Sequence, residues 1–243
     1  MEIGKRKANQ NPHRRVILAS SSPRRKELLN ELIPSFEVIS SDADEIEFHE
    51  KGPVFLVEDN AKIKASSVAR QFPQHWVLGA DTLVFCAERV LGKPQNLEEA
   101  FEMLLFLSGK THQVATGVSL QCLDIEKEYT FSEISDVTFK QLSEDIIKEY
   151  YLDVDPLDKA GGYAIQARAD LIVEKFAGSY SNVVGLPVEA LREKFDYFPR
   201  LNRIKYLAEH KISLNNQTPD EIISWFNNYN VKSGFGEMIL GES

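Results

Sequence analysis

Cysteine is scarce in this chain of 243 residues, where only Cys86 and Cys122 occur, each inside an apolar, strand-like stretch. Two cysteines supply neither a disulfide framework nor the ligands of a zinc cluster. We therefore expect both to be small buried side chains in a reducing compartment, which predicts a cytoplasmic protein.

Long apolar runs are also lacking, and none is long enough to cross a membrane as a helix. The first fifteen residues, MEIGKRKANQNPHRR, are basic and polar and have no apolar core segment. They do not resemble a secretory signal. We predict a flexible leader over residues 1–15 and no membrane association.

An excess of positive charge is the third absence, because the formal net charge is −9. Non-specific nucleic-acid binding requires a broad basic face, so this balance argues against a nucleic-acid partner. A small anionic ligand needs only a local positive pocket and is not excluded.

Apolar periodicity predicts strands alternating with helices, which is the pattern of an α/β protein with a mixed sheet. Strands are expected at 16–19, 36–39, 76–85, 114–123, 129–139, 161–166 and 171–176, with a tight turn into a short return strand at 87–90, and helices are expected at 23–32, 53–71, 96–108, 143–151 and 188–195. Two short amphipathic helices, 199–210 and 218–229, form a C-terminal extension expected to contact the domain or a second subunit.

The stretch LASSSPRRKELL places Arg24 and Arg25 in the first turn of a predicted helix, after Ser22 as N-cap and Pro23. Cations are disfavoured there by about 0.3–1 kcal/mol each. Two arginines at this end indicate either an anionic ligand at the helix terminus or a surface helix whose arginines point into water.

Asp81 stands inside the apolar run WVLGADTLVF. A buried carboxylate needs a cation, a metal or hydrogen bonds, so Asp81 is either a functional acid or the cap of a turn near Thr82. Gly79 is expected to let the backbone approach a ligand. Asp44 and Glu45 of the acidic loop SSDADE form a Mg²⁺ or Mn²⁺ site with Asp81 if the fold joins them, and otherwise are solvated.

Three lysines, Lys64, Lys93 and Lys159, suit a polyphosphate if they gather with the two arginines, although each alone resembles a surface lysine. The Gln166 amide can read a base edge through its donor and acceptor. His112 is expected to be structural. The segment LLFLSGKT ends like a phosphate-binding loop but lacks its first glycine and its strand-to-helix context, which argues against a P-loop ATPase.

Eight motifs together resemble the Maf family of nucleoside triphosphate pyrophosphatases, earlier described as septum-formation inhibitors. They fall in the family's order and spacing across about 180 residues, from Val16 to Phe195. The motifs are ILASSSPRRKELL, SDADE, NAKIKA, GADTLV, LGKP, LSGKTHQVATGV, DKAGGYAIQ and GSYSNVVGLP. Residues 16–198 are therefore predicted to form a Maf-like domain, between the leader and the 199–243 extension.

The resemblance implies a fold like that of inosine triphosphate pyrophosphatases, with a mixed sheet flanked by helices and two lobes around a cleft. It implies hydrolysis of a nucleoside triphosphate to the monophosphate and pyrophosphate with a divalent cation, Mg²⁺ or Mn²⁺. Asp81 would be the catalytic acid/base residue or a metal ligand, with Asp44 as the metal-site acid. The implied substrate-binding residues are Ser20, Arg24, Arg25, Lys64, Thr82, Lys93, Lys159 and Gln166, of which Arg24, Thr82 and Gln166 set substrate choice.

GADT together with DKAGGYAIQ resembles the family branch that acts on dTTP and UTP. The 7-methyl-GTP branch instead carries GSDQ and a cysteine at the position of Lys159. Ala167 departs from the family's glycine and is expected to tighten the turn after Gln166. The long tail leaves a homodimer open.

Two alternatives from other classes remain. One is a non-enzymatic regulator of cell division that acts through the tail helices on a protein partner. The other is a nucleic-acid-binding module that uses the Arg24–Arg25 helix, for which this acidic chain shows no basic, aromatic cluster.

Overall fold

The computed structural model describes residues 14–33 and 35–194. The predicted extension, 199–243, and most of the predicted leader, 1–15, lie outside the described residues. The domain boundaries drawn there remain predictions.

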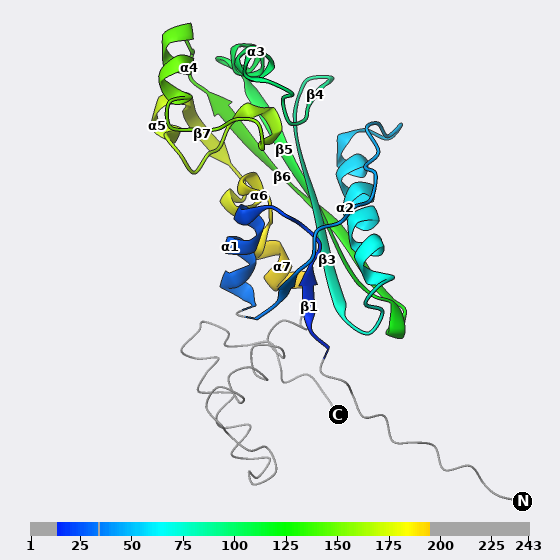
Figure 1. Cartoon of the computed structure of the whole chain (residues 1–243). Coiled ribbons are helices and arrows are strands. Elements are labelled where there is room, and N and C mark those ends of the chain that lie inside the picture. Colours follow the sequence, from blue (N-terminus) through cyan, green and yellow to red (C-terminus); the bar gives the residue numbers. More distant parts are fainter. Residues whose placement is uncertain (1–13, 34, 195–243) are drawn as a thin grey trace, which may run out of the picture. The chain divides into compact units, whose positions relative to one another are not determined.

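A seven-stranded mixed sheet forms the centre of the described part (Figure 1). Its hydrogen-bonded order is β2-β1-β3-β5-β6-β7, and β4 pairs separately with β3. β1 is parallel to both β2 and β3, and the remaining pairs are antiparallel. The strands are β1 Val16–Leu18, β2 Glu37–Val38, β3 Trp76–Cys86, β4 Arg89–Leu91, β5 Thr111–Cys122, β6 Lys127–Phe139 and β7 Val173–Ala177. The predicted α/β class with a mixed sheet is confirmed.

Helices flank this sheet, and most begin where the sequence places a capping residue. α1 starts at Pro23 after Ser22, although the Ser22 side chain makes no capping bond. Asn96 and Ser143 do accept capping bonds, from the backbone N–H groups of Glu99 and Ile146. The α-helices are α1 Pro23–Leu32, α2 Pro53–Ala69, α3 Leu97–Leu107, α4 Glu144–Tyr150, α5 Ala169–Ile172, α6 Tyr180–Val184 and α7 Val188–Lys194; the 3₁₀ turns are η1 Leu123–Ile125 and η2 Ala160–Gly162.

Three local predictions were wrong, all near the carboxyl end of the domain. The segment through Gln166 was expected to be a strand, but it forms η2 and then turns. Leu171 lies in α5, so β7 begins at Val173. The short helix α6 was not predicted, because its five residues are too few to show a helical period.

The long helix α2 lies directly against β3 and β5, because both strands carry a glycine at the contact. A Cβ atom added to Gly79 would lie 2.3 Å from the carbonyl oxygen of Ala61, and one added to Gly117 would lie 2.2 Å from that of Val57. Gly79 was expected to make room for a ligand. It makes room for the helix instead.

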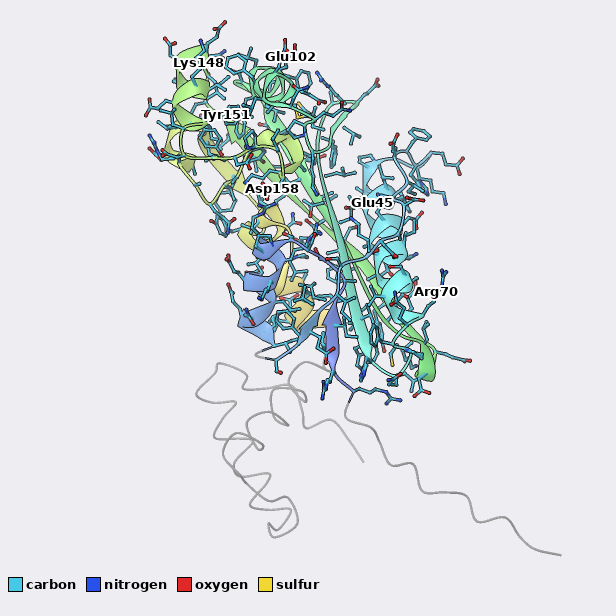
Figure 2. The ribbon with its side chains drawn as sticks, viewed as in Figure 1. Glu45, Arg70, Glu102, Lys148, Tyr151 and Asp158 are labelled. Atoms are coloured by element: carbon cyan, nitrogen blue, oxygen red, sulfur yellow. The ribbon has the colours of Figure 1, made fainter. Side chains whose placement is uncertain are left out.

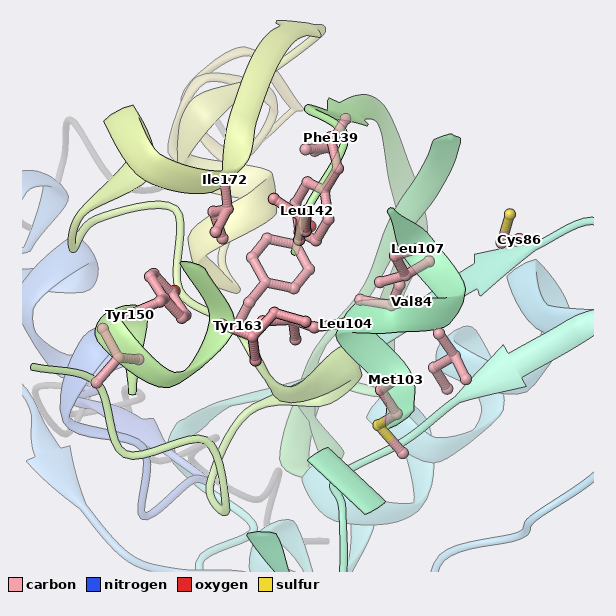
Figure 3. Packing of buried hydrophobic residues seen from close by; sticks show 14 of the residues in the cluster. Val84, Cys86, Met103, Leu104, Leu107, Phe139, Leu142, Tyr150, Tyr163 and Ile172 are labelled. Carbon is pink, nitrogen blue, oxygen red and sulfur yellow. The ribbon is translucent and has the colours of Figure 1, made fainter. Parts of the chain in front are cut away.

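Two separate clusters of buried apolar side chains lie along β3. The smaller contains Val77 with residues of β1 and α2, and the larger contains Val84 and Cys86 with residues of α3 and α4 and with Tyr163, which directly follows η2 (Figure 3). Asp81 and Thr82 lie between these two stretches of β3. This division agrees with two lobes that share one strand.

Both cysteines are buried and make no disulfide, as expected. Within residues 14–33 and 35–194, no helix combines the length and the apolar character that a membrane crossing requires.

Candidate active site

A pocket of about 480 Å³ opens between the two clusters. Its wall is formed by the turn from β1 into α1, the middle of β3, the loop after β4, the segment around η2, and the end of α6. Nine of the ten predicted site residues line it: Ser20, Arg24, Arg25, Lys64, Asp81, Thr82, Lys93, Lys159 and Gln166.

The charge of this lining is opposite to that of the whole chain. Five cationic side chains and three carboxylates line the pocket, whereas the chain as a whole has a net charge of −9. A surplus of cations in a partly enclosed site attracts a multiply charged anion. The pocket therefore suits a polyphosphate.

Asp81 is the most buried of the three carboxylates, with 6% of the residue exposed. The ammonium of Lys64 lies 2.7 Å from Asp81 Oδ1, and the amide of Asn60 donates to Oδ2 over 3.3 Å. Asn60 and Lys64 lie one turn apart on the face of α2 that covers β3. Helix α2 thus compensates the charge that β3 carries into the protein, as a buried carboxylate requires.

Arg25 is fixed by three protein oxygens. Its Nε donates to the carbonyl of Gly185 over 2.8 Å, and its terminal nitrogens donate to Ser20 Oγ over 3.3 Å and to Thr82 Oγ1 over 2.9 Å. Burial lowers the pKa of Arg25 below its ordinary value, while the Asp81 carboxylate acts in the opposite direction. Arginine nevertheless stays protonated in proteins, so the pocket has a rigid positive charge here.

Arg24 and Lys159 come together on the carboxylate of Asp158. Arg24 forms an ion pair of 2.7 Å with Asp158, and Lys159 forms another with the second carboxylate oxygen. Partial burial raises the pKa of Asp158, but hydrogen bonds from Lys159 and Arg24 outweigh it and bring the pKa below its usual value. Two predicted substrate ligands are thereby held side by side by one anion.

Lys93 and Gln166 lie on the open side of the pocket, and both side chains are exposed. Within the described residues, no carboxylate pairs with the Lys93 ammonium, which leaves it available to an anion. Gln166 follows the turn made by Gly161 and Gly162, whose positive φ angles of 70° and 71° favour glycine. Ala167 adopts a negative φ and so fits its turn without strain.

The acidic loop contributes Glu45 rather than Asp44. Asp44 is exposed and does not line the pocket, whereas Glu45 lines it and lies 2.9 Å from the ammonium of Lys64. Figure 2 labels Glu45 next to α2 and Asp158 on the other side of the pocket, in the segment that leads to η2. The structure therefore does not bring Asp44 to Asp81.

A divalent cation fits this arrangement only with help from a substrate. Asp81 and Glu45 both bind the ammonium of Lys64, so a cation held by both carboxylates would replace that ammonium between them. Within residues 14–33 and 35–194, no cluster of three or more acidic, histidine or cysteine side chains could hold a metal alone. One or two carboxylates plus phosphate oxygens are the ligands that Mg²⁺ commonly takes.

Sequence reasoning did not single out two residues of this site, Asn60 and Asp158, and it named Glu45 only together with Asp44. Asn60 and Asp158 stand inside the motifs NAKIKA and DKAGGYAIQ, beside the lysines that the charge pattern indicates as phosphate ligands. Glu45 could not be separated from Asp44, since the choice depends on the turn of an irregular loop.

His112 lies outside the pocket, in the larger apolar cluster, as its structural role predicts. Its ring contacts Phe139 and Tyr163 edge-on, and its Nε2 lies 2.8 Å from the Tyr163 hydroxyl. Burial lowers the pKa of His112 to about 4, although Asp136 acts in the opposite direction. His112 is therefore neutral near pH 7.

Comparisons with known proteins agree over the same part of the chain. A family model described as Maf-like protein matches residues 15–198. The chain is 46% identical over 185 residues to a dTTP/UTP pyrophosphatase of Bacillus cereus (strain B4264), a match that covers 76% of this chain and 96% of that protein. The dTTP/UTP pyrophosphatase of Bacillus anthracis (strain CDC 684 / NRRL 3495) matches with the same identity and coverage.

Among solved structures, the Ham1 protein of Staphylococcus aureus superimposes with a TM-score of 0.40 at 18% identity. That superposition covers 52% of this chain and 72% of the other.

Proposed function

This chain belongs to the Maf family, and from that premise we propose that it is a nucleoside triphosphate pyrophosphatase. It hydrolyses dTTP and UTP to the nucleoside monophosphate and pyrophosphate. The observation that carries the proposal is the meeting of a buried carboxylate, Asp81, with five cationic side chains in one pocket. The names of the Bacillus relatives support the choice of dTTP and UTP.

Asp81 acts on the attacking water in this proposal. The water oxygen forms a bond to the α-phosphorus while the bond from that phosphorus to the bridging oxygen breaks. Asp81 orients the water and accepts its proton, and the bond's electron pair leaves with pyrophosphate. Lys64, 2.7 Å from Asp81, compensates the carboxylate before the substrate binds.

Arg24, Arg25, Lys93 and Lys159 bind the phosphate oxygens. Arg25 is already fixed by three hydrogen bonds, so it loses little side-chain freedom when an anion binds. Arg24 presents a planar fork suited to phosphate, and the lysines supply point charges. Most of the rate is expected from positioning and from neutralised charge.

Mg²⁺ or Mn²⁺ would be held by Asp81 and Glu45 together with phosphate oxygens. When bound, such an ion neutralises phosphate charge and makes a nearby water more acidic. Glu45 takes the place expected for Asp44, because of these two residues of the acidic loop Glu45 lines the pocket and Asp44 does not. The base would lie at the open side, where the Gln166 amide can read its edge, with Thr82 close to Arg25.

The test is the release of pyrophosphate by the purified full chain with Mg²⁺ or Mn²⁺. Substrates are dTTP, UTP, CTP, dATP, GTP, ITP and 7-methyl-GTP, and the Asp81→Asn variant serves as the matched control. We expect dTTP and UTP to have the highest kcat/KM by about tenfold or more, since a site that hydrogen-bonds one base edge rejects others.

Three results would contradict the proposal in different ways. Release from no nucleotide with either cation would favour the cell-division regulator over the enzyme. Preference for 7-methyl-GTP would keep the chemistry and change the family branch. Full activity of Asp81→Asn would remove Asp81 from the mechanism.

A further inference from the structure

Asn60 is a buried polar residue of α2, only 3% exposed, that lies behind the pocket and does not line it. Its side chain makes three hydrogen bonds. Oδ1 accepts from the backbone N–H of Ile46 over 2.9 Å, while Nδ2 donates to the carbonyl of Ile46 over 3.0 Å and to Asp81 Oδ2 over 3.3 Å. One amide therefore joins the acidic loop to β3.

These three bonds use each kind of group that a primary amide offers. The two hydrogens of Nδ2 go to two different acceptors, and the oxygen takes one donor. A carboxylate would lack both donors, and an alanine would leave the Ile46 backbone groups and Asp81 without these partners. The three hydrogen bonds at this position therefore require the donors and the acceptor of a primary amide.

The loop bond matters because Ile46 directly follows Glu45. The Glu45 carboxylate is half exposed and reaches the pocket from an irregular loop. Its position therefore depends on how well the loop backbone is held. Asn60 holds the next residue by both its N–H and its C=O. Lys64, one helical turn further along α2, binds Glu45 and Asp81 at their charged ends.

We propose that Asn60 is a positioning residue for the reaction, setting both the orientation of the Asp81 carboxylate and the distance of Glu45 from it. The inference rests on the proposed function, because it concerns that site's two acids. Asn60 does not line the pocket, so its effect on substrate binding is indirect and small. It contacts Asp81 directly and acts on Glu45 through the neighbouring residue Ile46.

The experiment compares three variants of the full chain: Asn60→Ala, Asn60→Asp and Ser66→Ala. Ser66 is the matched control. Its hydroxyl also joins α2 to the sheet, by donating to Gln121 Oε1 over 2.9 Å, and this hydrogen bond does not involve Asp81. Amide hydrogen exchange at Ile46 is measured without nucleotide or metal. Steady-state kinetics with dTTP then give kcat and KM separately.

Amide exchange tests the loop bond without reference to activity. We expect Asn60→Ala to speed exchange at Ile46 by about tenfold or more, because the bond that protects it is gone. Asn60→Asp keeps an acceptor for this N–H and should retain protection, as should Ser66→Ala. Unchanged exchange at Ile46 in Asn60→Ala would overturn the loop half of the proposal.

Kinetics test the effect on the acids. We expect kcat to fall by about 10–100-fold in both Asn60 variants with KM changed less than about threefold, because misplacing a reacting group costs rate rather than binding. Ser66→Ala should keep the parent kcat. A KM increase at constant kcat, or an equal kcat loss in Ser66→Ala, would overturn the assignment.

Failure of the proposed function would look different from failure of this inference. A parent chain that hydrolyses no nucleotide would contradict the function, while the exchange result at Ile46 would still decide whether Asn60 holds the loop.

Discussion

Arg24 and Arg25 are neighbours in the sequence, yet different partners hold their guanidinium groups. Arg25 donates to three fixed oxygens of the protein, including Gly185 and Thr82, whereas Arg24 pairs with the half-exposed carboxylate of Asp158. The first is built into the wall of the pocket. The second can exchange its carboxylate for a phosphate.

Replacing each arginine by lysine should therefore separate stability from binding. Arg25→Lys should lower the free energy of unfolding by about 2 kcal/mol, because a lysine cannot reproduce three diverging hydrogen bonds. Arg24→Lys should lower it by less than about 1 kcal/mol, because the ion pair with the Asp158 carboxylate and the hydrogen bond to the Asp158 carbonyl are both exposed to solvent. Urea unfolding gives both values.

Substrate kinetics complete this comparison. Both variants should raise KM for dTTP, since both lose a guanidinium that faces the phosphates. Equal stability losses in the two variants would contradict the distinction drawn between them.

At the scale of elements, the site depends on how closely α2 approaches β3 and β5. Asn60 and Lys64 reach Asp81 only because Gly79 and Gly117 leave no side chain beneath the helix. The backbone of Gly117 also pairs with Asp81 in the ladder between β3 and β5. The glycines thus set the helix position that the acid requires.

Adding one methyl group at this contact should disturb both fold and site. In Gly117→Ala the new Cβ would lie 2.2 Å from the Val57 carbonyl oxygen, so α2 must move away. We expect a loss of about 3 kcal/mol in the free energy of unfolding. A lower kcat should accompany it, because Lys64 moves with the helix.

Gly92→Ala is the control for stability. Its Cβ would meet no atom within 4 Å, so the change should stay within about 0.5 kcal/mol. Calorimetry of Gly117→Ala and Gly92→Ala measures both changes in stability. A stable Gly117→Ala protein with the parent kcat would show that α2 tolerates displacement.

The sequence predicts the elements of this fold better than it predicts the loops that carry the site. The bounds of α1 were predicted without error because Ser22 and Pro23 mark its start and an apolar pattern follows. The segment around Gln166 was assigned to a strand because its residues are apolar, whereas Gly161 and Gly162 turn the chain there. Local pattern does not reveal such a turn.

For the same reason, one acid of the site could be predicted from the sequence and the other could not. Asp81 was predictable because a carboxylate inside an apolar strand is unusual in itself. The choice of Glu45 over Asp44 depends on the backbone of the loop, which Asn60 fixes from a different element. A contact of this kind, between α2 and the acidic loop, cannot be predicted from the sequence of either segment alone.

At the scale of the whole molecule, His112 links stability to pH. Burial lowers its pKa to about 4, while an unfolded histidine titrates near about 6.5, so the unfolded chain binds the proton more readily. His112 contributes stability fully above about pH 6.5, and the contribution falls as the pH drops toward about 4. Between pH 7 and pH 5 the loss should be about 2 kcal/mol.

Urea unfolding at several pH values measures this effect. His112→Gln should flatten the dependence of stability on pH between 5 and 7. Tyr163→Phe removes the hydroxyl that contacts the His112 ring but keeps the histidine. The stability of this variant should therefore still depend on pH between 5 and 7. An unaltered slope in His112→Gln would assign the effect to other groups.

The charge distribution also belongs to this scale. Five of the 28 lysine and arginine side chains of this acidic chain line one pocket, beside the strand β3 that contributes to both apolar clusters. The pocket is lined from both sides, by Arg25 on α1 and by Lys159 beside η2 among others, so a polyphosphate can contact both. Asp81 lies between them.

The most direct test of this chemistry is the hydrolysis of dTTP in water enriched in the heavy isotope of oxygen, followed by mass spectrometry of both products. Attack at the α-phosphorus predicts one heavy oxygen atom in dTMP and none in pyrophosphate, with Asp81→Asn forming neither product at a measurable rate. Label in pyrophosphate, release of orthophosphate, or parent-like turnover by Asp81→Asn would contradict the mechanism.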